Sequence, residues 1–191
     1  MIISIEGHDG IGKTTLAKAL AEELGFEYVK TPLSNLLGLT EENCLCALSN
    51  LIAYNDSFFT AWFLALNDMY ALKNYRNKNV IFDRHILLNC YWNYNDSTKK
   101  IFDISINYGG KPDLVILLTA SKETRISRLK IRNLSDKDLD EKIISHTENE
   151  KLIRFLQMYD YKYIIVDVDN LDKNEVLAIV RDTVIKQFSN F

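Results

Sequence analysis

The sequence predicts an α/β fold in which a five-stranded parallel sheet lies between two layers of helices. Three observations support this. Short apolar stretches alternate with longer helical ones along the whole chain. A glycine-rich loop joins the first strand to the first helix, and the third strand ends in an aspartate. Such alternation is typical of parallel sheets with helices on both faces and ligands at the carboxyl ends of the strands.

The glycine-rich loop covers residues 7–14 and reads G-H-D-G-I-G-K-T, which matches G-x-x-x-x-G-K-[ST]. Its glycines let successive N–H groups point at a phosphate, Lys13 reaches the β and γ phosphates, and the Thr14 hydroxyl binds Mg²⁺. An apolar strand (Ile2, Ile3, Ile5) precedes the loop and a helix over 15–24 follows it, as a three-layer P-loop NTPase fold requires. The chain is expected to bind ATP and Mg²⁺ through the loop residues Gly7, His8, Asp9, Gly10, Ile11, Gly12, Lys13, Thr14 and Thr15.

The remaining elements follow from apolar periodicity and from turn signals. Residues 26–30 and 80–82 predict the second and third strands, and two helices are expected between them, over 40–54 and 56–75. Beyond the third strand we expect helices over 86–94 and 99–108 and a strand over 114–118. Ser121 is the expected N-cap of a helix that ends near Arg132. A helix ending near Tyr159, a strand over 163–166 and a helix over 173–188 follow.

Size and composition indicate one globular domain over residues 1–191, with 47% hydrophobic residues. A net charge of −3 argues against a protein that coats nucleic acid. No apolar stretch reaches the length of a membrane span, and the first strand leaves no room for a signal peptide. The three cysteines are expected to be reduced thiols. These features predict a cytoplasmic protein that binds a small molecule, not nucleic acid or a membrane.

The third strand delivers Asp83 to the carboxyl edge of the sheet, near the expected Mg²⁺. Thr14 and Asp83 are therefore the candidate metal ligands, with Asp83 acting through water. The alternative is that Asp83 only caps the following helix.

Four segments, taken in order, resemble the thymidylate kinase family. They read I-E-G-H-D-G-I-G-K-T-T, F-D-R-H, K-P-D-L-V-I-L-L and R-I-S-R-L-K-I-R, and they run from the N-terminus to about Arg132. The resemblance implies transfer of the ATP γ-phosphate to a nucleoside monophosphate, most like dTMP. It also implies a dimer formed through helices. The face of the 56–75 helix that carries Phe59, Trp62, Phe63 and Leu66 is then either a dimer interface or part of the core.

The resemblance also implies roles for single residues. Asp9 would lie beside the acceptor sugar, and Arg84 between the donor and acceptor phosphates. Arg128 and Arg132 would serve the donor side and a lid-like segment near 128–145, and residues 168–171 would line the adenine pocket. The implied catalytic residues are Lys13, Arg84, Arg128 and Asp9.

Phosphoryl transfer depends on positioning and positive charge more than on a covalent nucleophile. Arg125, Arg128 and Arg132 are spaced three and four apart, so they share one helix face. Their guanidinium groups can hold phosphate oxygens in pairs. We expect Arg128 and Arg132 to act on the nucleotide and Arg125 to belong to a solvated basic face.

The acceptor side departs from the family pattern. No arginine occurs between Asn35 and Tyr75, where the family carries one that reads the acceptor phosphate. Residues 30–32 read Lys-Thr-Pro in place of Arg-Glu-Pro. A nucleoside or another small-molecule acceptor therefore stays open, although the glutamate base of nucleoside kinases is absent at Thr31 unless Asp9 or Glu6 replaces it. A non-catalytic nucleotide-binding protein is the third alternative.

Four further side chains carry weaker expectations. Glu6 is expected to organise the loop, and Asp113, at the amino end of its strand, to be structural. His8 either touches substrate or faces solvent. Aromatic residues that could sandwich a base are Phe58, Phe59, Trp62, Tyr91 and Trp92.

Overall fold

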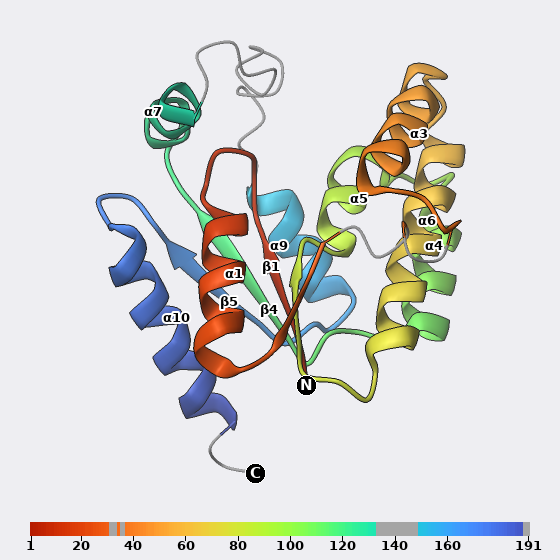
Figure 1. Cartoon of the computed structure of the whole chain (residues 1–191). Helices are drawn as coiled ribbons and strands as arrows, with labels where there is room; N and C mark the ends of the chain where they lie inside the picture. The colour runs from red at the N-terminus through yellow and green to blue at the C-terminus, as the bar shows by residue number, and fades with distance from the viewer. Residues whose placement is uncertain (31–33, 35–36, 133–148, 189–191) are drawn as a thin grey trace.

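A five-stranded, entirely parallel sheet forms the centre of the computed structural model, which describes residues 1–30, 34, 37–132 and 149–188 (Figure 1). The strand order is β2-β3-β1-β4-β5, which confirms the predicted sheet. The strands are β1 (Ile2–Glu6), β2 (Glu27–Val29), β3 (Val80–Asp83), β4 (Leu114–Thr119) and β5 (Tyr163–Asp167).

Helices cover both faces of the sheet, with α1 and α10 on one side and α4, α5 and α9 on the other (Figure 1). Their bounds are α1 (Lys13–Leu24), α3 (Glu41–Ala53), α4 (Ser57–Tyr75), α5 (Ile86–Asn93), α6 (Lys99–Ile104), α7 (Lys122–Arg132), α9 (Asn149–Met158) and α10 (Lys173–Phe188). The predicted helix over 99–108 is α6 followed by a π-helical turn at Ser105–Gly109. The lid-like segment expected near 128–145 runs past the end of α7, so most of it lies outside the described residues.

Side chains alternate between the two layers along each strand. Ile3 and Ile5 of β1 pack in the cluster beneath α1 and α10. Alternation turns Ser4 and Glu6 toward the opposite layer, in which α5 and α9 lie. Both polar side chains are buried, Ser4 completely and Glu6 with 2% exposed. The central strand therefore brings a carboxyl group beneath the phosphate loop.

Two structural expectations for single residues are confirmed. Asp113 Oδ2 accepts a hydrogen bond of 2.7 Å from the Ile2 amide, which joins the amino ends of β1 and β4. Ser121 caps α7, because its Oγ accepts from the Thr124 amide at 3.2 Å. Both contacts lie where a short polar side chain satisfies a backbone N–H that the regular element leaves open.

The large apolar face of α4 does not pack in the core of the single chain. Phe59 is 53% exposed and Leu66 44%. The residues that α4 buries are mostly small, among them Ala61 and Ala65, and these allow close approach to α5. The reading of this face as core is therefore wrong, because the helix packs through its alanine side.

Candidate active site

The phosphate loop depends on glycine at its tight points. Gly7, Gly10 and Gly12 have φ of 135°, 80° and 102°, a region that side chains with a Cβ rarely adopt. A Cβ at Gly7 would lie 2.6 Å from the Leu118 carbonyl oxygen, so the loop passes directly over β4. Gly12 immediately precedes α1, which brings the curled backbone to a helix N-terminus.

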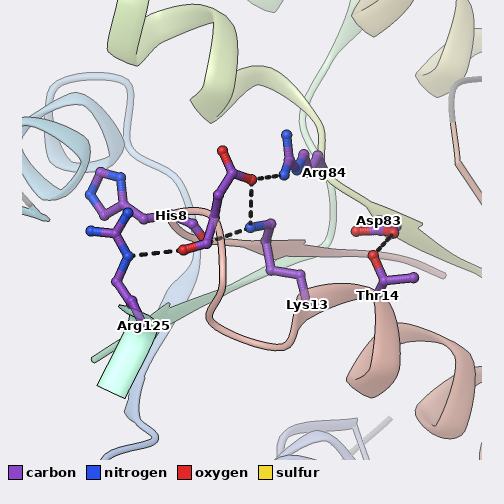
Figure 2. A network of polar contacts seen from close by, with 7 residues as sticks. His8, Lys13, Thr14, Asp83, Arg84 and Arg125 are labelled. Atoms are coloured by element: carbon purple, nitrogen blue, oxygen red, sulfur yellow. Dashed lines mark hydrogen bonds and ion pairs between the residues drawn. The ribbon is translucent and has the colours of Figure 1, made fainter. Parts of the chain in front are cut away.

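Lys13 is buried inside this curl, with 4% of the residue exposed. Its Nζ donates to the His8 carbonyl at 2.5 Å and lies 3.7 Å from Asp9 Oδ1 (Figure 2). Burial, and next the positive charge of Arg84, lowers the pKa of Lys13 from 10.5 to about 7. An anion bound in the loop would favour the ammonium form.

Asp9 joins two positive groups at the edge of the loop. Arg84 Nη2 donates to Asp9 Oδ1, and Lys13 Nζ forms an ion pair with the same oxygen. Burial opposes ionisation of Asp9, but the charges of Arg84 and Lys13 outweigh it and lower the pKa of this carboxyl. Asp9 is therefore ionised at neutral pH and is a weak proton acceptor. The structure thus brings together three of the four expected catalytic residues.

The expected metal ligands also meet. Thr14 Oγ1 donates to Asp83 Oδ2 at 2.6 Å, and the Tyr28 hydroxyl donates to the same oxygen at 3.0 Å. Asp83 Oδ1 is buried and has no hydrogen-bond partner among the described residues. This unsatisfied oxygen beside a threonine hydroxyl fits Mg²⁺, which takes few protein ligands and fills its shell with water and phosphate oxygens.

Tyr28 was not identified from the sequence. It lies in the middle of the three-residue strand β2. Strand alternation alone would not have shown that its hydroxyl reaches Asp83, because β2 pairs with β3 only in the folded sheet. Tyr28 also lines a groove of about 330 Å³ along the edge of the sheet, together with Thr14, Lys18, Glu27, Val29, Lys30 and Tyr75.

Helix α7 holds the other side of the loop, and here one expectation is wrong. Arg125 is 1% exposed and its Nε donates to the Asp9 carbonyl at 2.9 Å, so it does not belong to a solvated face. It lies one turn from Leu129, also 1% exposed, and this shared periodicity is the signal that could have identified it. Arg125 is buried because α7 passes close over the loop, where a Cβ at Gly10 would lie 2.7 Å from Leu129.

Arg128 links the loop to the segment after β5. Its Nη1 donates to the Ile11 carbonyl at 2.9 Å, and its Nη2 to the carbonyls of Val168 and Leu171 at 3.0 and 3.2 Å. The guanidinium therefore lies against residues 168–171, the segment expected to line the adenine pocket. Arg132 ends α7, and its backbone alone is described.

A narrow cavity of about 20 Å³ opens on the α5 side of the loop. His8 lies edge-on to Tyr91 there, with ring centroids 5.0 Å apart, so it faces protein rather than solvent alone. Of the candidate base-sandwiching aromatics, Tyr91 and Trp92 line this cavity and Phe58 and Phe59 do not. The other lining residues are Glu6, Gly7, Asp9, Leu87, Leu88, Arg125 and Leu152.

The fold and the loop define a P-loop nucleotide kinase. The sequence model of the thymidylate kinase family matches residues 5–179, and the chain belongs to this family. A relative from Saccharolobus solfataricus named "Probable thymidylate kinase 1" is 32% identical over 190 residues, covering 92% of each chain. A "Probable thymidylate kinase" from Methanococcus vannielii is 31% identical over 146 residues, covering 74% of this chain and 70% of the relative.

Solved structures show the same fold. A deoxyadenosine kinase from M. mycoides, with the products dCMP and a flexible dCDP bound, superposes with a TM-score of 0.71 at 26% identity. The match covers 97% of this chain and 100% of that one. The chain is thus an ATP-dependent phosphotransferase that acts on a small nucleotide or nucleoside. In the part of the chain that the structure describes, no helix combines the length and apolar character needed to cross a bilayer.

Proposed function

We propose that this kinase transfers the γ-phosphate of ATP to a nucleoside monophosphate, most like dTMP. The observation that supports this is the group formed by Lys13, Asp9 and Arg84 at the phosphate loop, of which Asp9 also lines the cavity on the α5 side. Two positive charges held on one carboxylate are suited to stabilising negative charge that develops as a phosphoryl group moves. Family membership supports dTMP as the first acceptor to test.

Each group has a proposed task. The loop amides and Lys13 hold the β and γ phosphates, and Arg84 leaves Asp9 in part to contact the transferring group. Thr14 and Asp83 would hold Mg²⁺, which neutralises phosphate charge when bound. Arg128 and Arg132 are proposed for the donor side. Asp9 orients Arg84 and Lys13 and lies nearest the acceptor.

A deoxynucleoside acceptor is the second candidate. The similarity to a deoxyadenosine kinase supports it, as does the lack of arginine between residues 35 and 75. Two lysines, Lys18 and Lys30, line the larger groove beside Thr14. A lysine supplies a point charge without the paired hydrogen bonds of arginine, so recognition of an acceptor phosphate would be weaker there.

The acceptor is identified by ATP consumption with Mg²⁺ against dTMP, other nucleoside monophosphates, nucleosides and no acceptor. We expect the largest stimulation with dTMP. Stimulation by nucleosides alone would replace the proposal with the second candidate. Absence of turnover with every acceptor, while ATP still binds, would contradict both.

Two variants test the site itself. Lys13→Ala is expected to lower kcat on the order of 100-fold or more while the protein stays folded, because the charge on the transferring phosphate loses its partner. Arg84→Ala should lower kcat more than it raises the KM for ATP, since its contribution is greatest in the transition state. Lys99→Ala, which removes an exposed lysine paired with Asp103, is the matched control. Undiminished turnover in Lys13→Ala would exclude the mechanism.

We also propose that two copies associate through the exposed face of α4, and that the protein is cytoplasmic. The exposed fractions of Phe59, Trp62 and Leu66 support the first proposal. The second is supported by the cysteines: Cys44 and Cys90 are buried, Cys46 is exposed, and none forms a disulfide.

A further inference from the structure

Arg84 itself has an unfavourable backbone conformation. Arg84 has φ of 76°, in the left-handed region that residues with a Cβ avoid. Such a conformation persists only where surrounding contacts hold it. Since the direction of the Arg84 side chain follows from this backbone, whatever holds the turn after β3 also aims the guanidinium.

Two hydrogen bonds from the turn amides to acceptors on β1 hold the turn. The Arg84 amide donates to the Ile5 carbonyl at 3.1 Å, and the next amide, His85 N, donates to Glu6 Oε1 at 2.7 Å. The first bond continues the pairing of β1 with β3. The second bond has a side chain as its acceptor. It is therefore not part of the regular backbone pairing and depends on the presence of Glu6.

Glu6 is itself fixed in place. Ser4 Oγ donates to the same Oε1 at 2.7 Å, and both residues are buried in β1, with Ser4 0% and Glu6 2% exposed. A carboxylate oxygen with two short hydrogen bonds and little room to rotate is a rigid acceptor. Through its bond with His85 N, Glu6 therefore holds the turn at Arg84 in a fixed position relative to β1.

The other contacts of the turn act elsewhere. The His85 ring lies 3.2 Å from the Asp68 carbonyl through Nε2 and stacks on Phe82, which fixes the ring and not the backbone of Arg84. Asp9 holds the far end of Arg84, at the guanidinium. The two ends of Arg84 are thus held by two different acidic residues, Asp9 at the tip and Glu6 at the base.

We propose that Glu6 is a positioning residue of phosphoryl transfer, whose Oε1 holds the left-handed turn at Arg84 and so directs the guanidinium toward the transferring phosphate. This inference rests on the proposed role of Arg84. It differs from the reading of Glu6 as a general base, because it requires an acceptor oxygen at Oε1 and no proton transfer.

The distinction makes Glu6→Gln and Glu6→Leu the informative pair. The amide oxygen of glutamine can accept from His85 N and Ser4 Oγ as the carboxyl does, whereas leucine cannot accept at all. We expect Glu6→Gln to keep kcat within about threefold of wild type and Glu6→Leu to lower it at least about tenfold, with the KM for ATP nearly unchanged in both.

A double-mutant cycle shows whether Glu6 acts through Arg84. With ATP, Mg²⁺ and the most active acceptor of the panel, kcat is measured for Glu6→Leu, Arg84→Ala and the combination. If Glu6 serves only to aim Arg84, the leucine variant has less than about a twofold effect once the guanidinium is gone. Asp113→Ala is the matched control. Like Glu6, Asp113 is a carboxyl group that accepts a hydrogen bond from a backbone amide, but its donor, Ile2 N, lies at the end of β1 away from the site.

The outcomes separate the two proposals. Equal loss in Glu6→Gln and Glu6→Leu, or additive losses in the cycle, would overturn the positioning role and leave the function of Arg84 intact. If Arg84→Ala instead retains full kcat, Arg84 has no role in phosphoryl transfer, and the positioning role of Glu6 is excluded as well. If Glu6→Leu does not fold, Ser4→Ala replaces it in the cycle. We expect this variant to lose less kcat than Glu6→Leu, and this loss must also disappear when Arg84 is replaced by alanine.

Discussion

Asp83 Oδ2 accepts hydrogen bonds from two residues at the proposed metal site, Thr14 and Tyr28. The Tyr28 bond, at 3.0 Å, orients the carboxylate so that its buried Oδ1 stays available. Groups that orient a metal ligand without touching the metal contribute strongly to affinity.

Removing the Tyr28 hydroxyl should therefore weaken metal binding. We predict that Tyr28→Phe raises the Mg²⁺ concentration for half-maximal activity roughly tenfold, with kcat near wild type at saturating Mg²⁺. Tyr163→Phe on β5, whose hydroxyl accepts a hydrogen bond of 3.3 Å from the exposed Gln157, is the control. An unchanged Mg²⁺ dependence in Tyr28→Phe would show that Asp83 is oriented without it.

The protonation of Glu6 affects stability separately from its contact with the turn. Burial raises the pKa of Glu6 from 4.5 to about 7, against the opposing effect of its hydrogen bonds from Ser4 and His85. Between these values the folded chain retains a proton that the unfolded chain has released. The contribution of Glu6 to folding is therefore fully present below pH 4.5 and is lost as the pH rises to 7.

Glutamine does not titrate, so we predict that Glu6→Gln gains stability relative to wild type between about pH 5 and 7, with no further change above pH 8. Urea unfolding of both proteins at four pH values measures the difference. His85, whose pKa burial lowers to about 4, changes stability in the opposite sense but is common to both proteins. A difference that is constant over this range would mean that Glu6 titrates normally in the fold.

At the scale of elements, α7 fastens the loop by donating to its carbonyls. Arg125 bonds Asp9 O and Arg128 bonds Ile11 O, so two arginines of one helix hold both sides of the loop turn. Helix α7 begins at the carboxyl end of β4 and lies above the sheet (Figure 1). A movement of α7 would therefore be transmitted to the phosphate loop.

Replacing the buried Arg125 should loosen this attachment. We predict that Arg125→Leu lowers the free energy of unfolding by about 1–3 kcal/mol, because the Asp9 carbonyl loses a buried donor. Arg125→Lys should not restore it, since lysine lacks the Nε–H that makes the bond. Arg154→Ala on α9, which breaks an exposed pair with Glu150, should unfold like wild type. Wild-type stability in Arg125→Leu would show that α7 is held by Leu129 and Arg128 alone.

At the scale of the whole molecule, the outer face of α4 presents four large apolar side chains to solvent: Phe58, Phe59, Trp62 and Leu66 are each at least 36% exposed. Exposed apolar surface of this kind on a helix indicates an interface. Helix α4 lies on the side of the molecule opposite α1 and α10 (Figure 1).

We predict that the protein sediments as a dimer and that Trp62→Asp converts it to a monomer, because a charge cannot be buried in an apolar interface without a partner. Ile179→Asp, at a residue of α10 that is 44% exposed, is the control and should leave the mass unchanged. A monomer in the wild-type protein over the micromolar range would exclude this interface.

The amino-acid sequence alone predicts the sheet, the phosphate loop and the meeting of Thr14 with Asp83. These features depend on local patterns: apolar runs of strand length, glycines at tight turns, and aspartates that follow strands. Parallel strands bring their carboxyl ends to one edge, so Thr14 and Asp83, which are distant in the sequence, are predicted to lie in one site. The place of Arg84 follows from the family resemblance.

Which helix faces are buried depends on how the elements pack against one another. The sequence predicts Arg125 in solvent and does not distinguish core from interface for Phe59, because a helical period marks a face without indicating which element covers it. The covering depends on how closely two elements approach, and here Gly10 lets α7 reach the loop while the alanines of α4 let it reach α5. The bond from His85 to Glu6 is likewise visible only once β1 and β3 are paired, because it joins residues 79 positions apart.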